Sequence, residues 1–86
     1  MDKNHPFLSL SKVDKDHPFL SVPVFQLPAS REFVYMAGLN HFENLKQMIA
    51  LPVVELEKRQ MFGQRMLGEL LELLEIHELG RLLKEN

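Results

Sequence analysis

The sequence predicts an all-α body of four to five short helices, preceded by an extended N-terminal arm. Two observations carry this prediction. After residue 30, apolar residues recur at three- and four-residue spacing, which is typical of helices with one buried face. Four of the five prolines precede residue 29, whereas all four glycines follow it. We therefore divide the chain into an arm, residues 1–29, and one helical domain, residues 30–86.

Length and composition limit the classes to which the chain can belong. Its 86 residues, 45% of them apolar, are enough for one hydrophobic core and too few for two. The absence of cysteine excludes disulfides, thiolate zinc sites and cysteine nucleophiles. A net charge of −2 does not favour avid binding of polyanions. The sequence shows no apolar run of roughly 18 residues and no signal-peptide core, so we expect a cytoplasmic protein that does not bind membranes.

The arm contains a duplicated DKxHPFLS segment. Residues 2–10 recur as residues 14–22, and seven of the nine positions are identical. Each proline biases the histidine before it toward extended backbone, and the Phe-Leu-Ser runs that follow are typical of short strands. The polar residues 11–16 suit a turn, so the arm can form a short hairpin.

Three roles fit this duplication. In the first, Phe7 and Phe19 cover the helical body as part of a hairpin or strap. In the second, the same aromatic side chains anchor the arm to a partner protein or to a second copy, which would make a homodimer. In the third, His5 and His17 form a metal pair, but nothing in the sequence fixes a ligand count or geometry. We therefore predict no metal site and no cofactor.

The helical body begins at Ser30, which can cap a helix over residues 31–37. Gly38 is expected to end that helix in the left-handed conformation. Asn40 and Glu43 have the spacing of a capping box and predict the start of a second helix. The apolar residues of this second helix are Phe42, Leu45, Met48 and Ile49.

Pro52 separates the second helix from a short third helix, and residues 59–63 form a tight connection to a longer leucine-rich helix. Continuing the phase of that helix would bring Glu78 into the apolar face, so it should end near His77. Gly68 costs about 1 kcal/mol relative to alanine, and we expect a neighbouring backbone to pack against it. The predicted apolar face holds Leu67, Leu70, Leu71 and Leu74, flanked by Met66 and Leu73.

The stretch from Phe42 to Leu79 combines an apolar-spaced helix, the run Val54-Glu55-Leu56, and the run FGQRMLGEL from Phe62 to Leu70. This pattern resembles the C-terminal domain of the bacterial RNA polymerase alpha subunit. The resemblance covers 38 residues, under half of the chain. It implies a compact helical fold built around a helix-hairpin-helix. It also implies contacts with the minor groove of A·T-rich promoter DNA and with transcription activators.

The resemblance places the family's hairpin glycine on Gly63, its second lysine on Arg65 and a later glutamate on Glu69. A glycine here lets backbone N–H groups approach a phosphate, and arginine can form a fork to it. The family's first lysine falls on Gln64 and its serine on Met66, so one charge and one hydroxyl are lost.

The family's groove-reading arginine and asparagine fall on Glu32 and Tyr35, and Arg31 lies one residue from the arginine position. Lys58 and Arg59 flank the hairpin and can add phosphate contacts, or they can be surface charges paired with nearby glutamates. The predicted DNA-binding residues are therefore Gly63, Arg65, Lys58, Arg59, Arg31 and Glu69.

Two functions follow. The first is a transcription-associated DNA-binding module that contacts phosphates at Gly63. The alternative is a protein-interaction module of the same fold that has lost DNA binding and uses the arm and the exposed aromatics Tyr35 and Phe62. We do not expect an enzyme, because His41, in the first turn of the second helix, and His77 belong to no recognisable triad.

Overall fold

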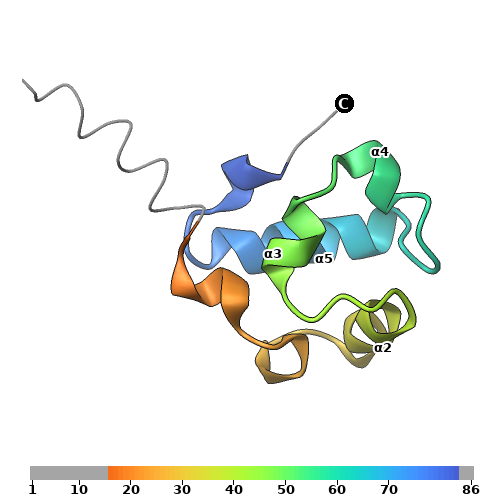
Figure 1. Ribbon diagram of the computed structural model, residues 1–86, viewed down its shortest axis with the longest axis horizontal. Coiled ribbons are helices and arrows are strands. Elements are labelled where there is room, and N and C mark those ends of the chain that lie inside the picture. Colours follow the sequence, from red (N-terminus) through yellow and green to blue (C-terminus); the bar gives the residue numbers. More distant parts are fainter. Residues whose placement is uncertain (1–15, 84–86) are drawn as a thin grey trace, which may run out of the picture.

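The computed structural model describes residues 16–83, and within this range every regular element is helical (Figure 1). The prediction of an all-α fold is therefore confirmed for the described part of the chain. Phe7 and His5 lie outside it. The α-helices are α2 (Arg31–Leu39), α3 (Leu45–Ile49), α4 (Val53–Leu56) and α5 (Gln64–Glu75), and the 3-10 helices are η1 (Pro18–Ser21), η2 (Val24–Gln26) and η3 (Gly80–Leu82).

One core joins these elements, and α5 runs along the body as its longest helix (Figure 1). Every α-helix, the two N-terminal 3-10 helices and the chain after α5 contribute buried apolar side chains. The fully buried members include Leu20, Phe33, Met36, Leu45, Met48, Leu56, Phe62, Leu70, Leu74 and Leu79. No polar side chain is buried within residues 16–83.

The buried face of α5 differs from the predicted one. Met66, Leu70, Leu73 and Leu74 are buried, whereas Leu67 is half-buried and Leu71 is 41% exposed. Leucine side chains lie on more than one side of this helix. A helical wheel therefore does not specify which of them the neighbouring helices bury. Gly68 is exposed, and no atom of a neighbour lies within 4 Å of where its Cβ would be. The expected backbone contact at Gly68 was therefore wrong.

The end of α2 corrects two predictions. The helix continues through Gly38 to Leu39, and the left-handed residue is His41, with φ of 62°. The Phe42 N–H donates to the Ala37 carbonyl at 2.8 Å, and the His41 N–H donates to the Gly38 carbonyl at 3.2 Å. This is the bonding of a Schellman motif. It uses the residues that were predicted to start the second helix, so His41 ends α2 instead of entering α3.

The cap of α3 lies four residues later than predicted. Asn44, not Asn40, is the N-cap, and its Oδ1 accepts the Gln47 N–H at 3.0 Å. The Gln47 side chain reaches back and accepts the Glu43 N–H at 2.6 Å, which resembles the reciprocal bonding of a capping box. Pro52 then forms the N-cap of α4, in agreement with its predicted position between two helices.

The end of α5 near His77 is confirmed. The Leu79 N–H donates to the Leu74 carbonyl at 2.8 Å, and Glu78 has a φ of 58°, so this helix also ends in a Schellman motif. The reversal turns Glu78 outward and returns Leu79 to the core, where it is 1% exposed.

The second copy of the repeat is not a strand. Residues 18–21 form η1, because Pro18 suits the first helical position and the His17 Nδ1 accepts the Phe19 N–H at 3.1 Å. Leu20 is fully buried, and the Phe19 side chain packs against the core. Phe19 therefore lies against the helical body, as in the first of the three roles considered for the repeat.

Candidate functional site

The α4–α5 connection, residues 57–63, holds three of the six predicted DNA-binding residues, Lys58, Arg59 and Gly63. Arg65 and Glu69 lie on α5, and Arg31 lies on α2. Its turn is closed by the Phe62 N–H, which donates to the Arg59 carbonyl at 3.1 Å, and Met61 has a φ of 62°. Phe62 is only 2% exposed, so the expectation of an exposed aromatic at this position was wrong. Its ring instead anchors the connection in the core.

Asn40 fixes the position of the connection relative to α2. The Asn40 Nδ2 donates to the carbonyls of Met36 and Gln60, both at 2.9 Å, and Oδ1 accepts the Gln60 N–H at 3.1 Å. We call the hydrogen bonds between Asn40 and Gln60 the Asn40 clamp. Sequence reasoning missed it, because an asparagine at the end of a helix can equally well be the N-cap of the next helix. Two bonds to one backbone residue hold α2 and the connection in register.

Gly63 lies directly before α5 and leaves the start of that helix open. It is the N-cap with φ of −100°, and no side chain caps the helix within residues 16–83. Apart from Gly63 itself and its two chain neighbours, no residue has an atom within 4 Å of where its Cβ would be. The first N–H groups of α5 therefore face an approachable surface, although the backbone of Gly63 does not require glycine.

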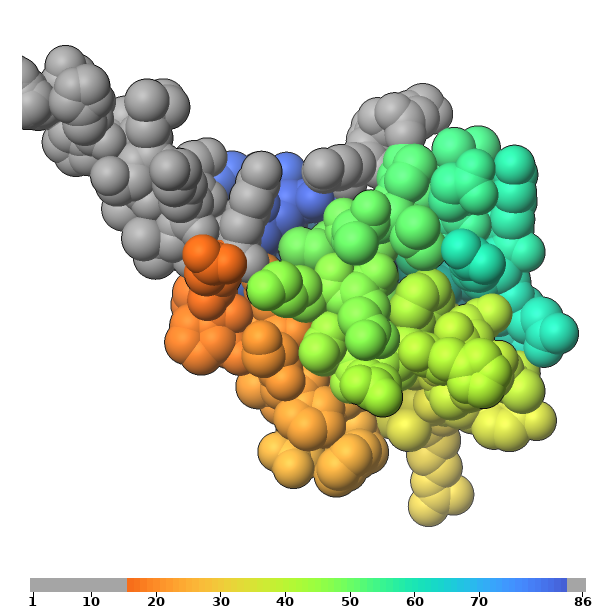
Figure 2. Space-filling model, viewed as in Figure 1, coloured from red at the N-terminus to blue at the C-terminus, as the bar shows by residue number. Residues whose placement is uncertain are grey.

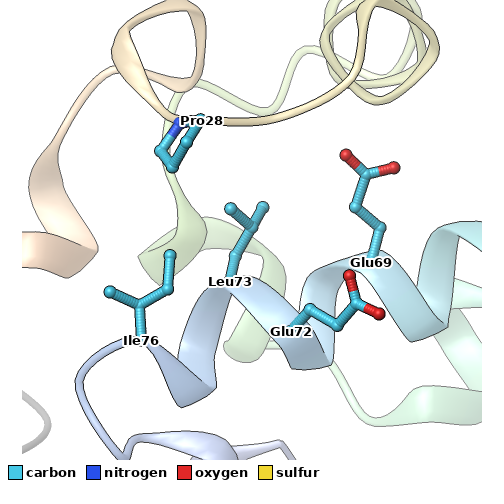
Figure 3. Close-up of a pocket in the computed structure, with 5 residues that line it drawn as sticks. All are labelled: Pro28, Glu69, Glu72, Leu73 and Ile76. Atoms are coloured by element: carbon cyan, nitrogen blue, oxygen red, sulfur yellow. The ribbon is translucent and has the colours of Figure 1, made fainter.

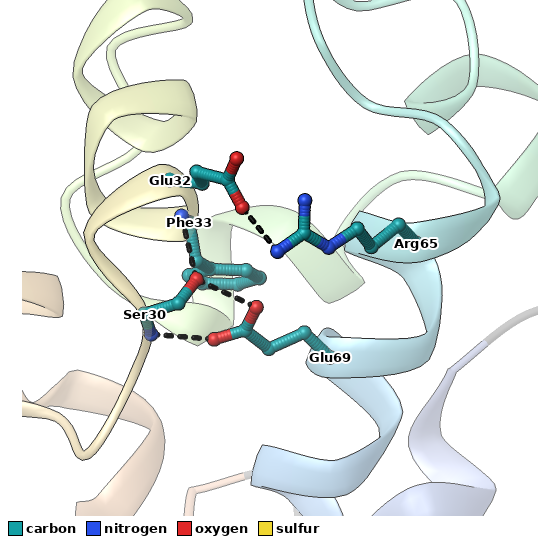
Figure 4. Close-up of polar contacts among 5 residues, drawn as sticks. All are labelled: Ser30, Glu32, Phe33, Arg65 and Glu69. Atoms are coloured by element: carbon teal, nitrogen blue, oxygen red, sulfur yellow. Dashed lines mark hydrogen bonds and ion pairs between the residues drawn. The ribbon is translucent and has the colours of Figure 1, made fainter.

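The basic side chains around the connection are partly neutralised. Arg65 forms an ion pair with Glu32 of α2, with both side chains at least half exposed (Figure 4). Lys58 pairs with Glu55 at 3.5 Å. Within residues 16–83 the Arg59 side chain has no ion-pair partner, and neither has Arg31. Two of the three basic side chains at the connection, Lys58 and Arg65, are thus paired with carboxylates, whereas Arg59 is not.

Glu69 is engaged in a contact between helices. Its Oε2 accepts the Ser30 N–H at 2.6 Å, and its Oε1 accepts the Ser30 hydroxyl at 2.8 Å (Figure 4). The Ser30 Oγ in turn accepts the Phe33 N–H at 3.1 Å, which confirms Ser30 as the N-cap of α2. Both oxygens of Glu69 therefore support the start of α2, a role that the sequence did not indicate.

An exposed apolar surface lies next to the Asn40–Gln60 contact. Tyr35 and Leu39, one turn apart on α2, are 62% and 37% exposed, and Met61 of the connection is 48% exposed. Figure 2 shows the end of α2 in yellow-green adjoining the connection in blue-green. We call Tyr35, Leu39 and Met61 the α2 patch.

Two other surface features are a hollow beside α5 and a pair of neighbouring histidine rings. A hollow of about 280 Å³ lies between Pro28 and α5 and is lined by Glu69, Glu72, Leu73 and Ile76 (Figure 3). The rings of His17 and His77 lie 4.9 Å apart, but the described residues contain no group of three side chains that could hold a metal ion. None of the helices described is long and apolar enough to cross a membrane.

Comparison of the chain with family models, curated proteins and solved structures finds no match. The resemblance to the polymerase alpha C-terminal domain therefore stays a prediction.

Proposed function

We propose that the chain is a protein-interaction module and that the α2 patch is its contact surface. The observation that carries this proposal is the ion pair between Arg65 and Glu32. Glu32 occupies the position where the resemblance calls for a groove-reading arginine. A phosphate approaching Arg65 would meet a carboxylate at the same place, and the two negative charges would repel each other.

The α2 patch has the composition of a binding surface. Tyrosine and methionine are enriched in protein interfaces, and Tyr35 replaces the asparagine that the resemblance calls for. The clamp at Asn40 holds the two contributing segments rigidly, which lowers the entropy lost on binding. Residues 16–83 carry nine acidic and six basic side chains, so the partner should offer an apolar cleft with a basic rim. The resemblance makes the transcription machinery the first place to look for it.

Fluorescence anisotropy with a labelled A·T-rich duplex tests the loss of DNA binding. We expect no binding by the wild type at about 50 mM salt, and a gain of binding in Glu32→Arg, which restores the arginine and removes the carboxylate. Binding by the wild type that falls steeply between about 50 and 200 mM salt, and disappears in Arg65→Glu, would contradict the proposal.

Co-purification tests the protein contact. A tagged wild-type chain is compared with Tyr35→Ala in lysate from the cells that make the protein. Ile76→Ala is the matched control, since Ile76 is 53% exposed but belongs to the other end of the body. We expect a partner that is retained by wild type and Ile76→Ala and lost in Tyr35→Ala. Equal retention by all three would exclude the α2 patch as the contact.

DNA binding at Gly63 is the second candidate, and one observation favours it. The first turn of α5 has open N–H groups and no side-chain cap, and Arg59 lies nearby without an ion-pair partner in the described region. A phosphate could accept from these N–H groups at the positive end of the helix. The anisotropy experiment separates this candidate from the first.

A further inference from the structure

The second copy of the repeat acts as a docking segment. Leu20 inserts fully into the core, and the Phe19 ring packs on the His77 ring with centroids 4.4 Å apart. His17 stabilises the turn through its bond to the Phe19 N–H. In Figure 1, η1 lies beside α3 and near the end of α5. We call the surface that receives it, formed by α3 and the chain around His77, the η1 site.

Every side chain that makes these contacts is also present in the first copy. His17, Pro18, Phe19 and Leu20 correspond to His5, Pro6, Phe7 and Leu8. The serine that follows is the same, and Val22, which packs at the edge of the core, is replaced by the similar Leu10. The first copy therefore carries the same apolar, proline and histidine determinants as the segment that occupies the site.

We propose that the η1 site accepts either copy, so that residues 5–10 occupy it whenever residues 17–22 of the same chain leave. The chain allows this exchange without disturbing the rest of the body. After the site, the backbone is held at Val24, whose N–H donates to the Glu43 carbonyl at 2.9 Å. With the first copy docked, residues 11–23 would form a loop between the site and Val24, and these residues are long enough to return the chain to Val24.

Loop entropy decides which copy prevails. A loop of this length disfavours the first copy by roughly 40-fold, so the second copy occupies the site in nearly all wild-type molecules. The same tether favours exchange within one chain over exchange between chains, because it gives an effective concentration of about millimolar. The duplication thus frees residues 14–22 for another contact while the core around Leu20 stays closed.

Crosslinking measures the occupancy of each copy. The chain has no cysteine, so two introduced cysteines define one crosslink. The pair Ser9→Cys with Glu43→Cys reports the first copy, and Ser21→Cys with Glu43→Cys reports the second, with a short bismaleimide as the reagent. Ser21 and Glu43 line one surface hollow, and these positions leave the phenylalanine and histidine rings of the contact in place. Leu20→Asp displaces the second copy, because burying a carboxylate lowers its occupancy by more than about 100-fold.

We expect the Ser9–Glu43 crosslink within one chain to be a few per cent in the wild-type background and at least tenfold higher with Leu20→Asp. Adding Leu8→Asp should abolish the crosslink and lower the melting temperature further than Leu20→Asp alone. Three results would overturn the proposal. These are a folded Leu20→Asp chain without the crosslink, equal melting temperatures of the single and double variants, and a crosslink that joins two chains instead of one.

Discussion

The contact between Glu69 and Ser30 should be a main support of the α2–α5 arrangement. Glu69→Ala removes a carboxylate that accepts both the N–H and the hydroxyl of Ser30, at 2.6 and 2.8 Å. Hydrogen bonds to charged groups contribute about 1.5–3 kcal/mol each, and the N-cap that they orient contributes about 1 kcal/mol. Glu69 is only half-buried, so solvent replaces part of this interaction, and alanine is the better helix former. We expect a net loss of about 2 kcal/mol in the free energy of unfolding.

Urea denaturation followed by circular dichroism at the helical minimum measures this loss. With an m-value of about 1 kcal/mol/M for so small a domain, the midpoint should fall by about 2 M. Glu69→Gln should lose about half as much, because the amide oxygen can still accept one bond whereas its NH₂ faces a donor. Glu72→Ala is the matched control, since Glu72 is an exposed glutamate on the same helix with no hydrogen bond or ion pair in the described region.

A double-mutant cycle with Ser30→Ala isolates the side-chain part of the contact. Ser30→Ala removes the Oγ bonds to Glu69 and Phe33 but leaves the backbone N–H of residue 30. The coupling energy should therefore be about 1 kcal/mol, smaller than the full effect of Glu69→Ala. If Glu69→Ala and Glu72→Ala shift the midpoint equally, the contact does not stabilise the domain and the reasoning is refuted.

Three further predictions concern stability and are checked by thermal melts. Gly68→Ala should raise the free energy of unfolding by about 1 kcal/mol, or roughly 4–8 °C in melting temperature, because the site is exposed and helical; an unchanged melt would contradict this. Phe62→Ala should lower the free energy of unfolding by about 3–5 kcal/mol through cavity formation, whereas Tyr35→Ala should change it by under about 0.5 kcal/mol. Equal effects would contradict the link between burial and stability on which this prediction rests. Asn40→Ala should cost about 2 kcal/mol by removing the clamp on Gln60, while Asn44→Ala should cost about 1 kcal/mol as the loss of an ordinary cap, so the reverse order would contradict the clamp.

Local patterns predicted much of the fold. Ser30 at the start of α2, Pro52 between two helices and the end of α5 near His77 follow from rules that involve only neighbours in sequence. The α3 cap failed because Asn40 and Asn44 both satisfy the local rule, and only the long-range contact with Gln60 assigns Asn40 to another role. The strand predicted at Phe19 failed for a similar reason, since Leu20 gains more by inserting into the core than by pairing in a hairpin.

The candidate site was less predictable because its charges interact across the fold. Lys58, Arg59 and Arg65 lie within five residues of Gly63 in the sequence. The sequence does not show that Glu32, 33 residues earlier, pairs with Arg65, nor that Glu69 is occupied by Ser30. Both contacts require the packing of α2 on α5. The sign of the surface charge at the connection thus depends on tertiary structure, and the net charge of the sequence does not predict it.

The left-handed residues explain why glycine was a poor guide to the helix ends. All three residues with positive φ, His41, Met61 and Glu78, carry side chains, and none of the four glycines adopts that conformation in the described chain. Each costs about 1 kcal/mol relative to glycine. In each case the next residue is apolar and turns inward: Phe42 is half-buried, and Phe62 and Leu79 are buried.

Burial of a large apolar side chain contributes about 1.5–3 kcal/mol, which exceeds the cost of the turn that delivers it. The reversal is therefore imposed by the residue that enters the core and not by the residue that turns. It follows that Met61→Gly should leave the position of Phe62 unchanged, whereas Phe62→Ala should release the turn even though Met61 itself is untouched. Backbone amide exchange at residues 61 and 62 would show the difference, and it should be faster in Phe62→Ala than in Met61→Gly. Faster exchange in Met61→Gly would contradict the inference that burial of Phe62 imposes the turn.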